Sequence, residues 1–218
     1  MGLLKEEDKT LLRQAFQALQ QPVKLIVFTQ PMECMYCRET REVAEEVADL
    51  SDKISLEVFD FTKDREMVDR YTIRRILAIV VMRGGDQPKD FGIRFYGIPA
   101  GYEFTPFIED ILMVSRGDSG LSAASRALLA ELKKPLHVQV FVASTCPYCP
   151  QAVRLAHQMA FESDLVQADM IEITEFPHLA LFYQVQGVPR TVINDRIKIE
   201  GAIPEAAMME WVREAMRS

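Results

Sequence analysis

Residues 137–149 read HVQVFVASTCPYC, and this stretch decides the fold of the second half of the chain. The run from His137 to Val142 is apolar and rich in β-branched residues, which is typical of a buried strand. A short loop follows, and then two cysteines separated by two residues, Cys146 and Cys149. A redox dithiol and a metal site are the two interpretations that such a pair leaves open in an intracellular protein.

The same arrangement occurs earlier in the chain. Residues 23–37 read VKLIVFTQPMECMYC, an apolar run that again ends in a pair, Cys34 and Cys37. The two pairs account for all four cysteines and lie 112 positions apart. The same offset aligns Asp60 with Glu172, Tyr71 with Tyr183, and Val80 with Val192. The chain is therefore a duplication, and we place the boundary in the turn-rich segment 117–120, which gives one unit at 1–117 and a second at 118–218.

Each unit shows the same order of periodic segments, α-β-α-β-α-β-β-α. Apolar residues at helical spacing indicate an opening helix, with Leu11, Leu12, Ala15, Phe16 and Leu19 on one face in the first unit and Leu128, Leu129 and Leu132 in the second. The expected strands are 23–28, 54–61, 78–82 and 93–95, and then 137–142, 169–173, 191–193 and 197–199. The last helices are expected to open at Pro106 and Pro204. A strand–helix–strand start implies parallel pairing, and the final hairpin adds an antiparallel strand. We predict an α/β protein of two tandem units, each a central mixed four-stranded sheet flanked by helices.

Composition narrows the classes of function. The chain has 218 residues, of which 49% are hydrophobic and 26% charged, so each unit can bury a core. Its net charge of −7 argues against nucleic acid as a partner. We find no apolar run long enough for a transmembrane helix, and the charged residues within 1–10 interrupt any secretory leader. We therefore expect a cytoplasmic protein without a membrane partner.

The two motifs and their frame carry a family resemblance. The layout resembles the thioredoxin fold, present twice, and Cys146-Pro147-Tyr148-Cys149 is similar to the glutaredoxin active-site motif. The tandem arrangement, with the phrase Phe95-Tyr96-Gly97-Ile98-Pro99-Ala100-Gly101, resembles the protein disulfide oxidoreductases of thermophilic prokaryotes. This resemblance covers nearly the whole chain. It implies thiol–disulfide exchange on protein substrates, with reduction, oxidation and isomerisation of disulfides as the reactions.

The chemistry assigns a role to each cysteine. A thiolate attacks a disulfide, and a strand-to-helix junction favours an anion because unpaired N–H groups and the helix dipole converge there. Cys34 and Cys146 are the expected nucleophiles, and Cys37 and Cys149 the resolving cysteines. Glu33 precedes Cys34 directly and disfavours a neighbouring thiolate, so we expect Cys146 to be the more acidic nucleophile. Pro147 stiffens the second loop.

The second motif also has a candidate docking segment. Thioredoxin-like proteins usually have a cis-proline facing the dithiol, and Val188-Pro189 fits this pattern. A cis bond there would expose the backbone of Val188 to an extended substrate, with Tyr148 at the rim. The equivalent position of the first unit is Leu77, after Ile76. A cis bond before leucine costs about 3 kcal/mol, so we predict a trans bond, no cis-proline equivalent, and a second site that dominates activity.

Two acids are candidates for proton transfer. The position six residues before the first cysteine, where ordinary thioredoxins have a buried acid, holds Phe28 in one unit and Val140 in the other. Asp60 and Glu172 are repeat equivalents in apolar strands and are the substitutes. The alternative role for both is a strand-end carboxylate in water or in an ion pair.

Other functions stay open. The four cysteines could hold one zinc ion, or the first pair could hold an iron–sulfur cluster, although we expect neither. No nucleotide-binding motif is present, so no bound cofactor is expected, and electrons must come from a thioredoxin reductase or a small thiol donor. The tandem is also similar to the N-terminal region of the alkyl hydroperoxide reductase flavoprotein, which suggests an electron carrier to a peroxiredoxin. A third class is a partner-binding scaffold with one degenerate unit.

Overall fold

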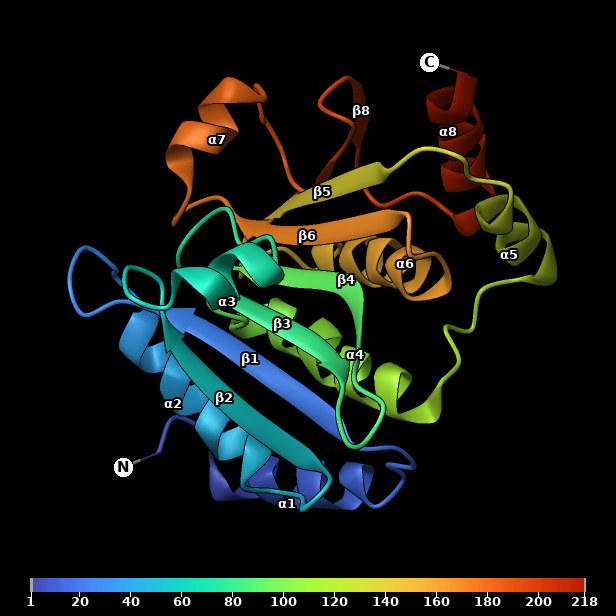
Figure 1. The fold of residues 1–218 in the computed structure, drawn as a ribbon. Helices are drawn as coiled ribbons and strands as arrows, with labels where there is room; N and C mark the ends of the chain where they lie inside the picture. Colours follow the sequence, from blue (N-terminus) through green and yellow to red (C-terminus); the bar gives the residue numbers. More distant parts are fainter. Residues whose placement is uncertain (1, 218) are drawn as a thin grey trace. The chain divides into compact units, whose positions relative to one another are not determined.

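The computed structural model describes residues 2–217 and shows a mixed α/β protein (Figure 1). The helices are α1 (Glu6–Phe16), α2 (Cys37–Ala48), α3 (Arg65–Arg70), the 3-10 turn η1 (Gly101–Glu103), α4 (Phe104–Arg116), α5 (Ala123–Ala130), α6 (Cys149–Glu162), α7 (Pro177–Phe182) and α8 (Glu205–Arg217). The strands are β1 (Val23–Thr29), β2 (Ile54–Asp60), β3 (Ala78–Arg83), β4 (Lys89–Tyr96), β5 (Leu136–Val142), β6 (Val166–Glu172), β7 (Arg190–Ile193) and β8 (Ile197–Glu200). The predicted element order is confirmed in both halves.

Contacts divide the chain into two compact units. The first comprises residues up to 90 together with 95–98 and 111–118, and the second comprises 91–94, 99–110 and the chain from 119 onward. The short segment 99–110, which contains η1 and the start of α4, therefore packs with the second unit. The separation at 117/118 into two domains stays a prediction.

Both units build the same sheet. In the first unit β1 pairs in parallel with β2 and antiparallel with β3, in the order β2-β1-β3-β4. In the second unit β5 pairs in parallel with β6 and antiparallel with β7, and β8 completes the order β6-β5-β7-β8. The central strands β1 and β5 are almost fully buried because helices cover them, as the parallel pairing requires. The mixed four-stranded architecture is the one that the sequence predicts.

The helices that follow the first strand of each unit position the cysteines. α2 packs against β1 and β2, and α6 packs against β5 and β6 (Figure 1). Their buried residues include Val43, Ala44 and Val47 in α2 and Leu155, Ala156 and Met159 in α6, as their helical spacing predicts. Each helix begins at the second cysteine of its motif, so packing of the helix fixes both motifs at the carboxyl end of the central strand.

Several boundaries differ from the sequence prediction. Leu11 is 64% exposed, because the buried face of α1 runs through Leu12 and Phe16, and Leu11 is turned about 100° away from Leu12. β6 begins at Val166 rather than at 169, and β4 extends from Lys89 to Tyr96. α8 begins at Glu205, directly after Pro204, whereas α4 already begins at Phe104. No helix within residues 2–217 is long and apolar enough to cross a bilayer.

Candidate active site

The second dithiol lies in the loop between β5 and α6. Cys146 and Cys149 form a disulfide with a Cα–Cα distance of 5.5 Å. Cys146 is 8% exposed and Cys149 is fully buried, so Cys146 is the sulfur that a substrate reaches first. The backbone N–H of Cys149, at the start of α6, lies 3.2 Å from Cys146 Sγ. This donor and the helix N-terminus would stabilise a thiolate at Cys146 after reduction.

A cis peptide bond faces this dithiol. The Val188–Pro189 bond is cis, as predicted, and it directly precedes β7. The carbonyl oxygen of Val188 lies 3.7 Å from Cys146 Sγ. The segment that could pair with an extended substrate is therefore in contact with the attacking sulfur. Pro147 and Tyr148 are exposed beside it.

The first dithiol has the same frame. Cys34 and Cys37 form a disulfide with a Cα–Cα distance of 5.5 Å, Cys37 is buried, and Cys34 is partly exposed. The backbone N–H of Gln30 donates to Cys37 Sγ at 3.4 Å. Both cysteines line an open pocket of about 610 Å³. Its polar lining residues include Arg38, Arg41, Asp60 and Asp64.

The trans bond predicted before Leu77 is wrong. The Ile76–Leu77 bond is cis, at the position equivalent to Val188–Pro189. Leu77 is buried and leads into β3, so the tertiary fold, rather than the local preference of the residue, sets the peptide geometry. The first unit lacks the proline but keeps the same backbone turn, so the missing proline is no reason to exclude a docking backbone there.

Asp60 lies in the first pocket but is tied up locally. Its carboxylate accepts hydrogen bonds from the backbone N–H and hydroxyl of Thr62 and the backbone N–H of Lys63, and it pairs with the Lys63 ammonium at 3.2 Å. The Thr62 hydroxyl, together with the other donors, lowers the pKa of Asp60 to about 2. A carboxylate that is ionised throughout the neutral range has no proton to give, so the structure favours the alternative role, a strand-end anion.

Glu172 is buried at the end of β6, where it accepts hydrogen bonds from the backbone N–H groups of Thr174 and Glu175. These bonds fix the turn that follows the strand. Glu172 also affects a second acid that sequence reasoning missed, Glu103.

Glu103 is completely buried at the end of η1. Both of its carboxylate oxygens lack a hydrogen-bond partner among the described residues. Burial, and then the charge of Glu172, raise the pKa of Glu103 to about 8. This acid carries a proton near neutral pH and can release it slightly above, which is the property expected of a proton-transfer group.

The turn η1 brings Glu103 to the second dithiol. The N–H of Tyr102 donates to the carbonyl of Ser144 at 2.9 Å, two residues before Cys146, and η1 packs against α6. Gly101 has a φ of +59°, and a Cβ there would lie 2.3 Å from the Ser144 oxygen, so only glycine permits this approach. The sequence signal was an acid inside an apolar segment, Tyr102-Glu103-Phe104, but the expected boundary assigned that segment to the other unit.

Comparisons with known proteins agree with this geometry. The thioredoxin domain model matches residues 136–213, which hold the second dithiol. The thioredoxin of Methanocaldococcus jannaschii is 31% identical over 80 residues, covering 36% of this chain and 94% of that protein. The chain belongs to the thioredoxin family.

Similar solved structures extend the likeness of this thioredoxin-family chain to both units. A protein disulfide oxidoreductase from Aeropyrum pernix superposes with a TM-score of 0.91 at 26% identity, covering 98% of this chain and 94% of the other. The N-terminal domain of the alkyl hydroperoxide reductase flavoprotein from Enterococcus faecalis superposes at 0.87 with 25% identity, covering 95% and 99%. With two Cys-x-x-Cys pairs at disulfide distance, the chain is a thiol–disulfide oxidoreductase built as a tandem of thioredoxin-like units.

The flavoprotein relatives are longer. The alkyl hydroperoxide reductase flavoprotein of Escherichia coli is 23% identical over 194 residues, which are 89% of this chain but only 34% of that protein. The chain thus spans about a third of the length of these relatives.

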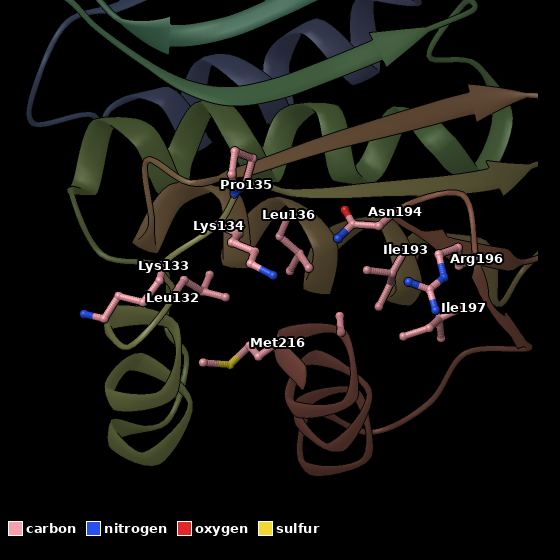
Figure 2. A pocket seen from close by; sticks show the side chains of 11 residues that line it. Leu132, Lys133, Lys134, Pro135, Leu136, Ile193, Asn194, Arg196, Ile197 and Met216 are labelled. Atoms are coloured by element: carbon pink, nitrogen blue, oxygen red, sulfur yellow. The ribbon is translucent and has the colours of Figure 1, made fainter. Parts of the chain in front are cut away.

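Two further features lie outside the thioredoxin-type chemistry. Within residues 2–217 no group of three or more His, Cys, Asp or Glu side chains could hold a metal ion, which counts against the zinc and iron–sulfur alternatives. A separate cavity of about 250 Å³ contains no cysteine (Figure 2). Leu136 lines it at the first residue of β5, whereas Cys146 follows the last, so this cavity lies at the opposite end of the strand from the dithiol.

Proposed function

We propose that the chain exchanges disulfides with protein substrates mainly through Cys146 and Cys149, with Cys146 as the nucleophile. The observation that carries this ranking is the surroundings of the second dithiol. An accessible sulfur, a backbone carbonyl in contact with it at Val188, and a buried proton carrier at Glu103 all meet there. Among the described residues we find no acid of comparable pKa beside the first dithiol, where Asp60 is ionised.

Reduction of a substrate then proceeds in two exchanges. The Cys146 thiolate attacks one sulfur of the substrate disulfide, and the other sulfur leaves as a thiolate and takes up a proton. The mixed disulfide places the substrate segment beside the backbone of Val188. Cys149 then loses its proton and attacks Cys146 Sγ, which releases the second substrate thiol and leaves Cys146 and Cys149 oxidised. Glu103 accepts or returns the proton of the buried Cys149 thiol, because η1 packs against the helix that Cys149 begins.

The test compares two single substitutions in the full chain. Cys146→Ser is expected to remove most turnover on an insulin-like disulfide with a thiol donor, and Cys34→Ser to retain most of it. Serine matches cysteine in size, so the fold should persist in both. Loss of turnover in Cys34→Ser with retention in Cys146→Ser would overturn the ranking of the sites.

A second candidate function is electron transfer from a thioredoxin reductase to a peroxiredoxin. The likeness to the alkyl hydroperoxide reductase flavoproteins over 89% of this chain favours it. Both cysteine pairs are kept here, so either could carry electrons. Reconstitution with a thioredoxin reductase, a peroxiredoxin and peroxide separates the two functions, because a carrier sustains peroxide reduction without a disulfide-bonded protein substrate. Either function suits a cytoplasmic setting, where reductases and small thiols supply electrons.

A further inference from the structure

The first dithiol is flanked by two thioethers. Met32 and Met35 stand on either side of Cys34, and Met35 lies inside the loop between the two cysteines. The two methionine side chains are 77% and 79% exposed, so neither fills a gap in the core. Four sulfur-bearing side chains therefore fall within the six residues 32–37.

The second dithiol lacks this feature. Its flanking and intervening residues are Thr145, Pro147 and Tyr148, none of which carries sulfur. Its two cysteines are also both buried, whereas Cys34 is partly exposed. The duplication thus supplies an internal comparison, since the same frame holds a sulfur-rich loop in one unit and a loop with only the two cysteine sulfurs in the other.

We propose that the reduced first dithiol binds Cu(I), with Cys34 and Cys37 as thiolate ligands and Met32 and Met35 as thioether donors. Thiolates and thioethers are soft ligands that select Cu(I) over the commoner divalent ions. Zinc fits poorly, because it requires four nitrogen, oxygen or thiolate ligands, and no such group exists among the described residues. Each methionine has three rotatable bonds, so an exposed thioether can swing toward a metal held by its neighbours.

The local electrostatics favour the complex. Two thiolates and one Cu(I) carry a net charge of −1. The N-terminus of α2, which begins at Cys37, stabilises negative charge there, and the N–H of Gln30 already points at Cys37 Sγ. The open pocket beside the dithiol gives the ion a path to the sulfurs.

Binding is coupled to the redox state. The disulfide of Cys34 and Cys37 has no thiolate to offer, so the oxidised site does not bind. A dithiol or phosphine donor supplies two electrons and breaks the S–S bond, and Cu(I) then replaces the two thiol protons. In the reverse direction, an acceptor disulfide takes two electrons from the thiolate pair together with two protons, the Cys34–Cys37 bond re-forms, and Cu(I) leaves.

The experiment uses the full chain with Cys146→Ser and Cys149→Ser, so that only the first dithiol remains. After reduction with a phosphine and its removal under nitrogen, the protein competes for Cu(I) with the chromogenic chelator bicinchoninate. We expect one Cu(I) per chain, and none after reoxidation. Adding Met32→Leu and Met35→Leu should weaken Cu(I) affinity at least about tenfold without changing the number of titratable thiols.

A matched control carries Cys34→Ser and Cys37→Ser and keeps the second dithiol. It should bind Cu(I) at least about tenfold more weakly than the first dithiol, since it has no thioethers. Equal affinity of the two dithiols, or unchanged affinity after the methionine substitutions, would overturn the proposal. The readout is metal binding, so its result is independent of which dithiol dominates substrate turnover.

Discussion

At the scale of single residues, Glu103 is the side chain whose chemistry departs furthest from its usual behaviour. A carboxylic acid without hydrogen-bond partners pays the full cost of desolvation when it ionises, so it keeps its proton. Asp60 shows the opposite case, since three donors and a lysine hold it ionised. Neighbours rather than residue type thus decide which acid can move a proton.

Glu103→Gln should therefore change the pH dependence of both exchange and stability. In the unfolded chain Glu103 titrates near 4.5, and in the native protein at about 8, so between these values the native state binds more protons. The free energy of unfolding should fall as pH rises through this window in the native sequence, and this part of the slope should vanish in the variant. The second dithiol should also lose the inflection near pH 8 in its exchange rate.

Urea unfolding and exchange rates across about pH 5 to 9 would measure both effects. Exposed Glu131→Gln is the control and should leave both profiles unchanged. Parallel profiles for the native chain and Glu103→Gln would contradict the raised pKa.

At the scale of elements, the β7–β8 hairpin shows how a turn serves the core. Asn194 and Asp195 have φ values of 48° and 59°, which is the conformation of a type I′ turn, as the predicted tight hairpin requires. The Asp195 carboxylate accepts hydrogen bonds from the Tyr183 hydroxyl and from Gln139 Nε2 at 2.9 Å, and Gln139 is fully buried.

Asp195→Gly should destabilise the protein by about 1–3 kcal/mol, although glycine suits the turn better, because it leaves the buried Gln139 short of an acceptor. Asp195→Asn keeps an acceptor oxygen and should recover most of the loss. Chemical denaturation of the three proteins makes the comparison. A glycine variant more stable than the native chain would show that turn conformation outweighs the buried hydrogen bonds.

The contact between α4 and α6 within the second unit depends on a buried pair. Asp110 and His157 are almost fully buried, with Asp110 Oδ2 2.6 Å from His157 Nδ1. Burial raises the pKa of Asp110, and His157 and Arg154 partly offset this. His157 therefore has a packing role, about two turns along α6 from Cys149.

Asp110→Ala should cost about 3–5 kcal/mol, since it leaves a buried imidazole without its acid. The neighbouring Glu109 forms a partly exposed pair with Arg154, so Glu109→Ala should cost at most about 1 kcal/mol. Denaturation midpoints at constant m-value provide the measurement. Equal losses in the two variants would mean that the buried pair contributes no more than a surface pair.

At the scale of the whole molecule, duplication gives one frame with two different redox centres. The first has Glu33 beside its nucleophile, and the second has the Cys149 N–H near Cys146 Sγ. Titration against glutathione should therefore resolve two two-electron couples, with the second at the higher potential because its thiolate is better stabilised. Variants with one pair changed to serine should each show one couple. A single shared midpoint, or the reverse order, would refute the difference in acidity.

The sequence alone determined the repeated fold and the four cysteines. Periodicity and spacing depend on local backbone geometry, so the strand, helix and motif pattern reads directly from the chain in both halves. Pro189 was likewise predicted, because a proline carries its cis tendency in its own ring.

Only the tertiary structure decided the cis bond before Leu77 and the acid beside the second dithiol. Both depend on surroundings supplied by distant residues. The buried turn into β3 imposes the geometry at Leu77, and the contact between η1 and the Ser144 loop removes Glu103 from water. Local preferences are properties of a residue, whereas desolvation and backbone paths are properties of the packed chain, and the latter appear only when segments far apart in sequence meet.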